Sequence, residues 1–201
     1  PSYLEQGDSS LIYMVNHLIK KSSNNSSFIE LDFNKLKKLS IELKEQKVLL
    51  IGVSYALLEI AEQGNLNLNN WTIMETGGMK GRRKEIIREE LHKELVNAFN
   101  VNFIHSEYGM TELLTQAYSK GKGIFSTPNW MKILIRDFED PFSYKMPLNS
   151  GGVNIIDLAN IYSCSFIETQ DIGKEISEKE IEILGRFDNS DIRGCNLISF
   201  N

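Results

Sequence analysis

The chain has 201 residues, 41% of them hydrophobic, which is enough to bury a core as one domain or two small subdomains. Its net charge of -5 argues against a nucleic-acid-binding protein, which usually carries a basic face. Two cysteines form no disulfide framework and no apolar run approaches the ~20 residues of a membrane span, so we expect a cytoplasmic protein.

The first part of the chain alternates helical and strand patterns. Apolar residues recur at helical spacing in 9–21 and 34–45, and a continuous apolar run at 48–53 is typical of a strand buried on both faces. A helix at 55–63, a short strand at 71–74, a long helix at 82–99 and a short strand at 102–105 follow. This alternation predicts a parallel sheet with crossover helices over residues 1–120.

The pattern changes after about residue 121. Strand patterns follow one another at 130–136, 152–157, 165–168 and 180–184, with no long helix between them. We therefore predict an α/β fold whose parallel sheet is followed by a smaller antiparallel or barrel-like β subdomain over residues 121–201.

Four glycine-marked segments carry groups that suit a nucleotide-binding site. They are Glu75-Thr-Gly-Gly78, Tyr108-Gly-Met-Thr-Glu112, Thr169-Gln-Asp-Ile-Gly173 and Gly185-Arg-Phe-Asp-Asn-Ser-Asp-Ile-Arg-Gly194. Backbone amides in glycine turns, one hydroxyl, one metal-binding carboxylate and one ribose-binding carboxylate together suit a bound ATP. Each segment alone is a weak signal, so the argument depends on their order and spacing.

The second segment is the most specific of the four. Gly109 permits a tight turn after a strand. Thr111 offers a hydroxyl to an α-phosphate, Glu112 offers a hard oxygen to Mg²⁺, and Tyr108 offers a ring that can stack on adenine. The alternative is an ordinary turn in which Thr111 caps a helix running through residues 114–117.

The other three segments have equally simple alternatives. Gly77 and Gly78 can bring backbone amides against the base, or form a plain turn before a helix. Asp171 can accept both ribose hydroxyls from a strand end, or belong to a turn between two strands. Arg186 can reach the ribose or the α-phosphate, or form a salt bridge in a surface turn.

The motifs Tyr-Gly-x-Thr-Glu, Thr-x-Asp-x-Gly and Gly-Arg-x-Asp-x-x-x-x-x-Gly occur here in that order, and they resemble those of the adenylate-forming superfamily of acyl-CoA synthetases, luciferases and peptide-synthetase adenylation domains. Over 1–197 the chain is most similar to the acyl-protein synthetase family, the long-chain-fatty-acid–luciferin-component ligases. The resemblance implies that Thr111 and Glu112 serve phosphate and Mg²⁺, that Asp171 binds ribose, and that Arg186 lies near ribose and phosphate.

The chain departs from the superfamily pattern in three ways. Gln170 replaces the glycine more usual before the aspartate. The Ser/Thr/Gly-rich phosphate loop with its lysine does not occur in residues 1–201, and the usual C-terminal subdomain with a catalytic lysine does not follow the last motif. Because the chain also begins at Pro1 rather than Met, we expect residues upstream of Pro1 and expect this fragment alone to adenylate poorly.

Cysteine and histidine positions add two weaker hypotheses. The resembling family uses a cysteine near its C-terminus as an acyl carrier, which makes Cys195 a candidate carrier, although a buried structural cysteine is the simpler interpretation. Cys164 is interpreted as a strand-interior residue. His105 ends a predicted strand and can line a carboxylate pocket, whereas His17 and His92 are interpreted as ordinary helix-face residues.

The resemblance therefore predicts an ATP-dependent ligase that uses Mg²⁺, forms an acyl-AMP from a fatty acid or other small carboxylate, and passes the acyl group to a thiol. The acceptor is Cys195, a partner protein, or coenzyme A as in phenylacetate-CoA ligase-like enzymes. A nucleotide-binding or scaffolding module without turnover is the second hypothesis, and an unrelated α/β domain is the third. The sequence leaves open whether the protein forms a homo-oligomer.

Overall fold

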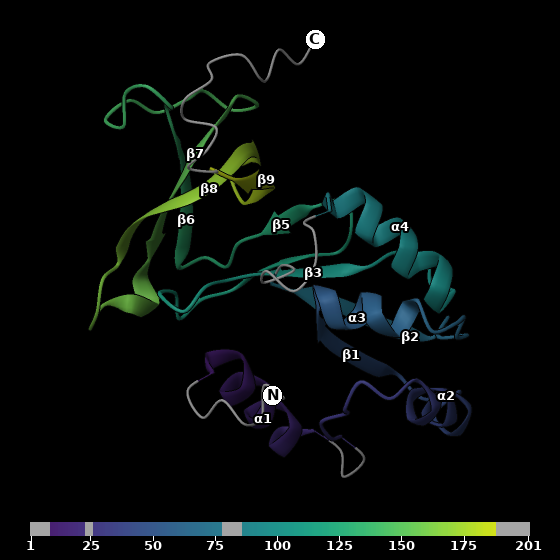
Figure 1. Cartoon of the computed structure of the whole chain (residues 1–201). Coiled ribbons are helices and arrows are strands. Elements are labelled where there is room, and N and C mark those ends of the chain that lie inside the picture. Colours follow the sequence, from purple (N-terminus) through teal and green to yellow (C-terminus); the bar gives the residue numbers. More distant parts are fainter. Residues whose placement is uncertain (1–8, 23–25, 78–85, 188–201) are drawn as a thin grey trace.

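The computed structural model describes residues 9–22, 26–77 and 86–187 (Figure 1). The described helices are α1 (Ser10–Lys21), α2 (Phe33–Glu42), α3 (Ser54–Ala61), α4 (Arg88–Phe99) and the short 3₁₀ helix η2 (Leu158–Asn160). The described strands are β1 (Val48–Val53), β2 (Trp71–Thr76), β3 (His105–Tyr108), β4 (Ala117–Ser119), β5 (Ile124–Ser126), β6 (Met131–Arg136), β7 (Ser150–Asp157), β8 (Phe166–Ser177) and β9 (Glu180–Arg186).

These strands form one sheet in the order β1-β2-β3-β4-β5-β9-β8-β7-β6. The pairs β1–β2 and β2–β3 are parallel, and every pair from β3–β4 to β7–β6 is antiparallel. The predicted α/β fold class, a parallel sheet followed by an antiparallel part, is therefore confirmed. In Figure 1 β6 and β7 run steeply across the direction of β1 and β3, as expected of a strongly twisted sheet.

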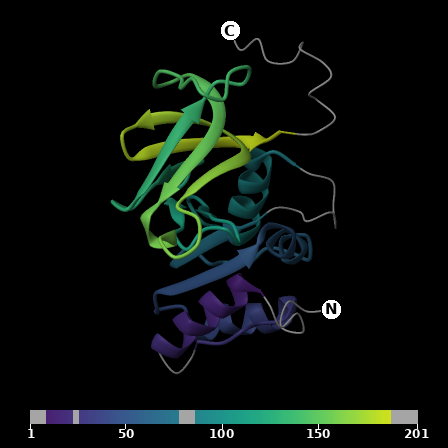
Figure 2. The same ribbon diagram turned by 90° about the vertical axis from the view of Figure 1, so that its left-hand side faces the viewer.

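Two groups of buried apolar side chains stabilise the two parts. The first lies among α2, α3, α4, β1 and β2, and Leu68, Ile73, Leu95 and Phe99 have no exposed surface in it. The second lies among β3 to β9 and centres on Phe125, Val153 and Ile155. Figure 2 shows the antiparallel strands stacked above the parallel strands and α3. The proposed division near residue 120 stays a prediction.

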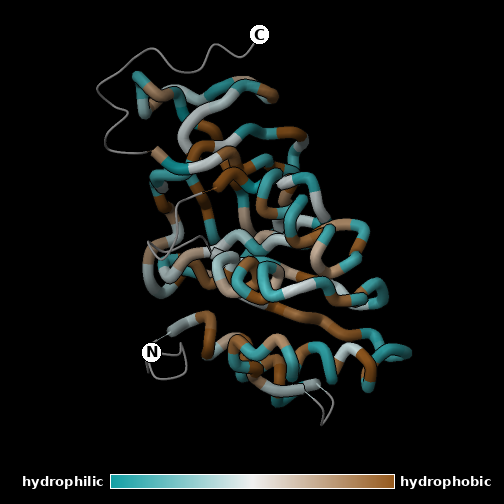
Figure 3. The backbone as a smooth tube through the Cα atoms, turned by 45° about the vertical axis from the view of Figure 1, so that its right-hand side comes forward, coloured by the Kyte–Doolittle hydropathy of each residue, from teal (hydrophilic) through white to brown (hydrophobic). Residues whose placement is uncertain are grey.

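Hydropathy along the chain agrees with this layering. Figure 3 shows hydrophobic stretches along strands and alternating hydrophilic and hydrophobic turns along helices. Helix α1 is amphipathic, yet none of its residues is buried, and only Leu11 from it packs against the first core. No helix in the described ranges combines the length and the hydrophobicity that crossing a bilayer requires.

Several element boundaries differ from the sequence prediction. The apolar run 48–53 is an edge strand with Leu49 51% exposed, so it is not buried on both faces. The strand expected at 102–105 lies at His105–Tyr108, because parallel pairing with β2 sets Met74 against His105 and Thr76 against Glu107. The described part of the helix expected at 82–99 begins at Arg88, and Ile87, expected on its inner side, is 67% exposed.

Strand β8 is the largest correction in the antiparallel part. It runs from Phe166 to Ser177, so Asp171 lies inside a strand rather than at a strand end or in a turn. Cys164 was expected inside a strand but precedes β8 and is exposed. Residues 111–119 contain no helix in the structure, which excludes the alternative in which Thr111 caps a helix through 114–117.

Candidate functional site

Contacts between Tyr108, Asp171 and Arg186 join three of the four glycine-marked segments. The Tyr108 hydroxyl donates a 2.7 Å hydrogen bond to Asp171 Oδ2, in a buried position. Arg186 Nε lies 3.3 Å from Asp171 Oδ1, because β8 and β9 pair these two residues directly. Burial and the neighbouring Asp171 charge raise the pKa of Tyr108, so the hydroxyl keeps its proton and remains a donor.

Asp171 retains capacity for a ligand. A carboxylate has about four acceptor positions, and Tyr108 and Arg186 use two of them. Asp171 is 8% exposed as a residue, whereas the Arg186 side chain over it is 71% exposed. The Tyr108 ring is also buried and lies edge-on to Phe125, with the ring centroids 5.9 Å apart. Stacking of this ring on adenine stays a prediction.

A buried arginine that the sequence did not single out holds the backbone around Asp171. Arg136 is 7% exposed and donates to the carbonyl oxygens of Val153 and Thr169, at 3.0 and 2.8 Å. Its guanidinium also lies 5.7 Å from the centroid of the Phe187 ring. Side chains alternate between the two faces of a strand, so residue 136 is expected on the face away from buried Ile135. The periodicity of β6 therefore did not predict that Arg136 is buried.

The Thr111–Glu112 turn is exposed and follows β3 directly. Leu113 N donates to the carbonyl of Met110 at 3.1 Å, which closes the turn. The side chains of Thr111 and Glu112 make no hydrogen bond or ion pair with any other described residue. A free, exposed carboxylate fits Mg²⁺, which proteins commonly hold through one or two carboxylates while substrate phosphates and water complete the octahedron.

A second polar cluster lies beside the Gly77 segment, at the carboxyl ends of β2 and β3. The Ser54 hydroxyl lies 2.9 Å from Glu75 Oε2 and 2.7 Å from the Gly77 carbonyl oxygen. His92 Nε2 lies 3.4 Å from Glu75 Oε1 and 3.3 Å from the Ser106 hydroxyl. Arg88 reaches Glu75 at 3.9 Å and donates to the carbonyl of Ile183 in β9. This cluster therefore links the Gly77 segment to the strand that carries Arg186.

Opposing effects set the pKa values of two carboxyls at this edge. Burial alone would raise the pKa of Glu75, but hydrogen bonds from His92, Ser106 and Ser54, with the charge of Arg88, hold it below its ordinary value. Glu107 has a raised pKa because of burial and the nearby Glu75 charge, only partly offset by a hydrogen bond from Thr76. Its Oε2 atom is buried without a hydrogen-bond partner among the described residues.

The remaining predicted residues lie in different settings. Gly77 follows β2 with a φ of 67°, a left-handed conformation that glycine adopts without strain. His105 is half-buried against Phe103, at 5.0 Å between ring centroids, and its pKa is lowered chiefly by burial. Gly78 and Cys195 lie outside the described residues. The sequence interpretation missed His92 as a site residue, although Arg88 and His92, four residues apart, share one helix face.

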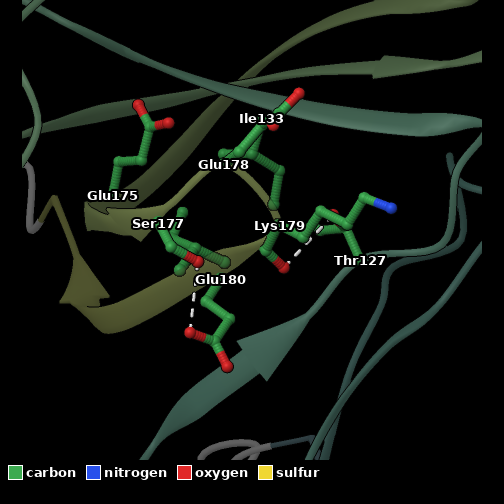
Figure 4. Close-up of a pocket in the computed structure, with 8 residues that line it drawn as sticks. Thr127, Ile133, Glu175, Ser177, Glu178, Lys179 and Glu180 are labelled. Atoms are coloured by element: carbon green, nitrogen blue, oxygen red, sulfur yellow. Dashed lines mark hydrogen bonds between the residues drawn. The ribbon is translucent and has the colours of Figure 1, made fainter.

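A shallow depression at the β8–β9 hairpin is separate from these motifs. Thr127, Glu175 and residues 177–181 line most of it, as Figure 4 shows. The Ser177 hydroxyl donates to Glu180 there, and Thr127 donates to the Lys179 carbonyl. None of the predicted site residues lines it, so we place the candidate site at the motifs instead.

The fold is similar to that of several solved enzymes. ATP-bound MatB from Rhodopseudomonas palustris matches with a TM-score of 0.57 and 17% identity, over 79% of this chain and 34% of MatB. The luciferase-like enzyme of the nonluminescent Zophobas morio mealworm matches with a TM-score of 0.55 and 13% identity, over 80% and 42% of the two chains. The chain therefore has the fold of part of these enzymes.

A third solved structure has a similar fold, and the coverages of the three show how much of each enzyme the chain spans. O-succinylbenzoate coenzyme A synthetase from Bacillus subtilis, in complex with ATP and a magnesium ion, matches with a TM-score of 0.53 and 21% identity, over 81% of this chain and 36% of that enzyme. The chain thus spans about a third to two-fifths of the length of these enzymes. No protein-family model and no curated protein matches the sequence. At these identities the likeness concerns the fold.

Proposed function

We propose that the chain is part of an ATP-dependent carboxylate-activating ligase that forms an acyl-AMP and passes the acyl group to a thiol. The observation that carries this proposal is the Asp171 carboxylate, held by Tyr108 and Arg186 where three of the four motifs meet, in a fold shared with ATP-bound enzymes. Asp171 accepts the ribose hydroxyls with its unused acceptor positions. The exposed Arg186 guanidinium shifts toward the negative α-phosphate.

The other residues of the site complete a nucleotide pocket. Glu107 Oε2, a buried acceptor with no partner among residues 9–22, 26–77 and 86–187, suits an amino group such as that of adenine. Thr111 would donate its hydroxyl to an α-phosphate oxygen, and Glu112 would hold Mg²⁺, which would supply positive charge to neutralise the phosphates. The substrate carboxylate oxygen then attacks the α-phosphorus, and the new oxygen–phosphorus bond gives the acyl-AMP. The bond from the α-phosphorus to the oxygen that bridges to the β-phosphate breaks, and pyrophosphate leaves.

Our proposal for the acid substrate and the acceptor thiol follows the resemblance to the acyl-protein synthetase family. The acid is a fatty acid or another small carboxylate, with His105 in its pocket, and the protein acts in the cytoplasm. The acceptor thiol is Cys195 or belongs to a partner protein. Coenzyme A is the alternative acceptor, which makes a phenylacetate-CoA ligase-like enzyme the nearest competing assignment. The chain alone is expected to be inactive, because no lysine-bearing phosphate loop occurs in its 201 residues.

The second candidate function is a nucleotide-binding module without turnover, which would use the same contacts of Asp171 with Tyr108 and Arg186. Carboxylate-dependent ATP–pyrophosphate exchange separates the two. The acid panel should run from short to long fatty acids and include aromatic acids. The chain should be assayed beside any longer protein that contains it. Exchange by the longer protein alone supports the ligase, whereas nucleotide binding without exchange by either protein supports the module.

A further inference from the structure

Helix η2 lies against the Thr111–Glu112 turn although about 45 residues separate them in the chain. Asn160 Nδ2 donates to the carbonyl of Glu112, and Asn160 Oδ1 accepts from Leu114 N at 2.8 Å. Asp157 Oδ2 accepts from Thr115 N at 3.0 Å, and Asp157 Oδ1 accepts from the Thr115 hydroxyl at 2.6 Å. Asp157 and Asn160 are 0% and 2% exposed, so these bonds are shielded from water.

The same two side chains also fix their own loop. Asp157 caps η2 by accepting from Ala159 N at 3.0 Å, and Asn160 Nδ2 lies 3.3 Å from the carbonyl of Cys164. Trp130 adds a bond from its indole N–H to the Thr115 hydroxyl oxygen at 3.1 Å. The backbone of residues 112–115 is therefore held by buried groups, while the side chain of Glu112 is exposed and makes no hydrogen bond or ion pair within the described part of the chain.

We infer that Asn160 and Asp157 are positioning residues that hold the 112–115 backbone so that the Glu112 carboxylate meets the Mg²⁺ of bound Mg–ATP. This inference rests on the proposed function. Neither residue touches the nucleotide, and both act through the turn. The bonds fix the carbonyl of Glu112 and the amides of Leu114 and Thr115, which sets the direction of the Glu112 side chain. Groups that orient a metal ligand in this way typically contribute about 10–100-fold to metal affinity.

The test compares two ligands on the chain by isothermal titration calorimetry. The affinity for AMP without Mg²⁺ should depend on Asp171 and the base pocket, whereas the affinity for Mg–ATP should also depend on Glu112. Asn160→Ala should leave AMP affinity within about twofold of wild type and weaken Mg–ATP binding by about 10–100-fold, and Glu112→Gln should have the same pattern of effects. The matched control is Asn149→Ala, which removes the same side chain from an exposed loop position and should change neither affinity.

Milder variants keep the test decisive if Asn160→Ala does not fold. Asn160→Asp keeps the acceptor for Leu114 N but loses the donor to the Glu112 carbonyl. Thr115→Val removes the hydroxyl that donates to Asp157 and accepts from the Trp130 indole, and leaves the Thr115 N–H bond to Asp157 in place. Both should weaken Mg–ATP more than AMP. Equal weakening of the two ligands, or unchanged Mg–ATP affinity in a folded variant, overturns the positioning role alone. Failure of folded wild type to bind either ligand overturns the proposed function as well.

Discussion

Replacing Tyr108 with phenylalanine removes one hydroxyl from a buried hydrogen bond and leaves the ring in place. The lost partner is the Asp171 carboxylate, at 2.7 Å, and a hydrogen bond to a charged group contributes about 1.5–3 kcal/mol. Arg186 remains beside Asp171, but this exposed ion pair is already present in the wild type, so it does not replace the lost hydrogen bond. The free energy of unfolding should therefore fall by about 1.5–3 kcal/mol.

Urea and thermal denaturation followed by circular dichroism measure this loss. For a domain of this size it corresponds to a fall in melting temperature of roughly 3–12 °C. Tyr118→Phe is the matched control, because Tyr118 is 42% exposed on the adjacent strand β4 and its hydroxyl loss should cost less than about 0.5 kcal/mol. Equal effects of the two substitutions would refute the assignment of a stabilising Tyr108–Asp171 bond.

Three further substitutions test other parts of the site. Gly152→Ala would place a Cβ 2.4 Å from Arg136 Cζ, so the buried guanidinium must move; we expect a loss of at least about 2 kcal/mol in urea denaturation, and a loss below about 0.5 kcal/mol would contradict this packing. The pKa of Glu75 lies below 4.5, so its ionised form stabilises the fold above pH 4.5 and that stability is lost as the pH falls through the folded-state pKa. The stability difference between wild type and Glu75→Gln should therefore shrink on acidification, and a constant difference would argue against the network. Glu107 has the opposite sign, because its pKa is raised above 4.5 and its ionisation costs stability as the pH rises. Glu107→Gln should thus exceed wild type in stability near pH 7 and lose that advantage near pH 4, and lower stability at both pH values would contradict the raised pKa.

Local sequence patterns were sufficient to predict the order and type of most helices and strands. Helical spacing and apolar runs predicted α1 to α4 and the change from parallel to antiparallel pairing, because each signal lies within one segment. The sequence prediction ended strand β8 at residue 168, although it continues to Ser177, because Asp171 and Gly173 are residue types typical of turns. A Cβ on Gly173 would lie 2.8 Å from Val153 Cγ2, so this glycine serves close packing inside the sheet rather than a turn.

The buried polar partners of the site could not be read from the sequence. Arg88 and Ile183 are 95 residues apart, and Asn160 and Glu112 are 48 apart, so no periodicity connects them. These hydrogen bonds form only when the folded sheet brings the distant segments side by side. The motifs indicated which segments form the site. The structure adds the buried and half-buried side chains that connect those segments, namely Arg88, Arg136, Glu75, Asp157 and Asn160.

Titration of AMP into the chain by calorimetry, for wild type and Asp171→Asn, tests the central claim of a nucleotide site most directly. Loss of the charged acceptor should weaken AMP binding by about 1.5–3 kcal/mol, or roughly 10- to 150-fold, while circular dichroism shows both proteins folded. Folded wild type that does not bind AMP, or equal affinity in the two proteins, would contradict the assignment of Asp171 to the ribose.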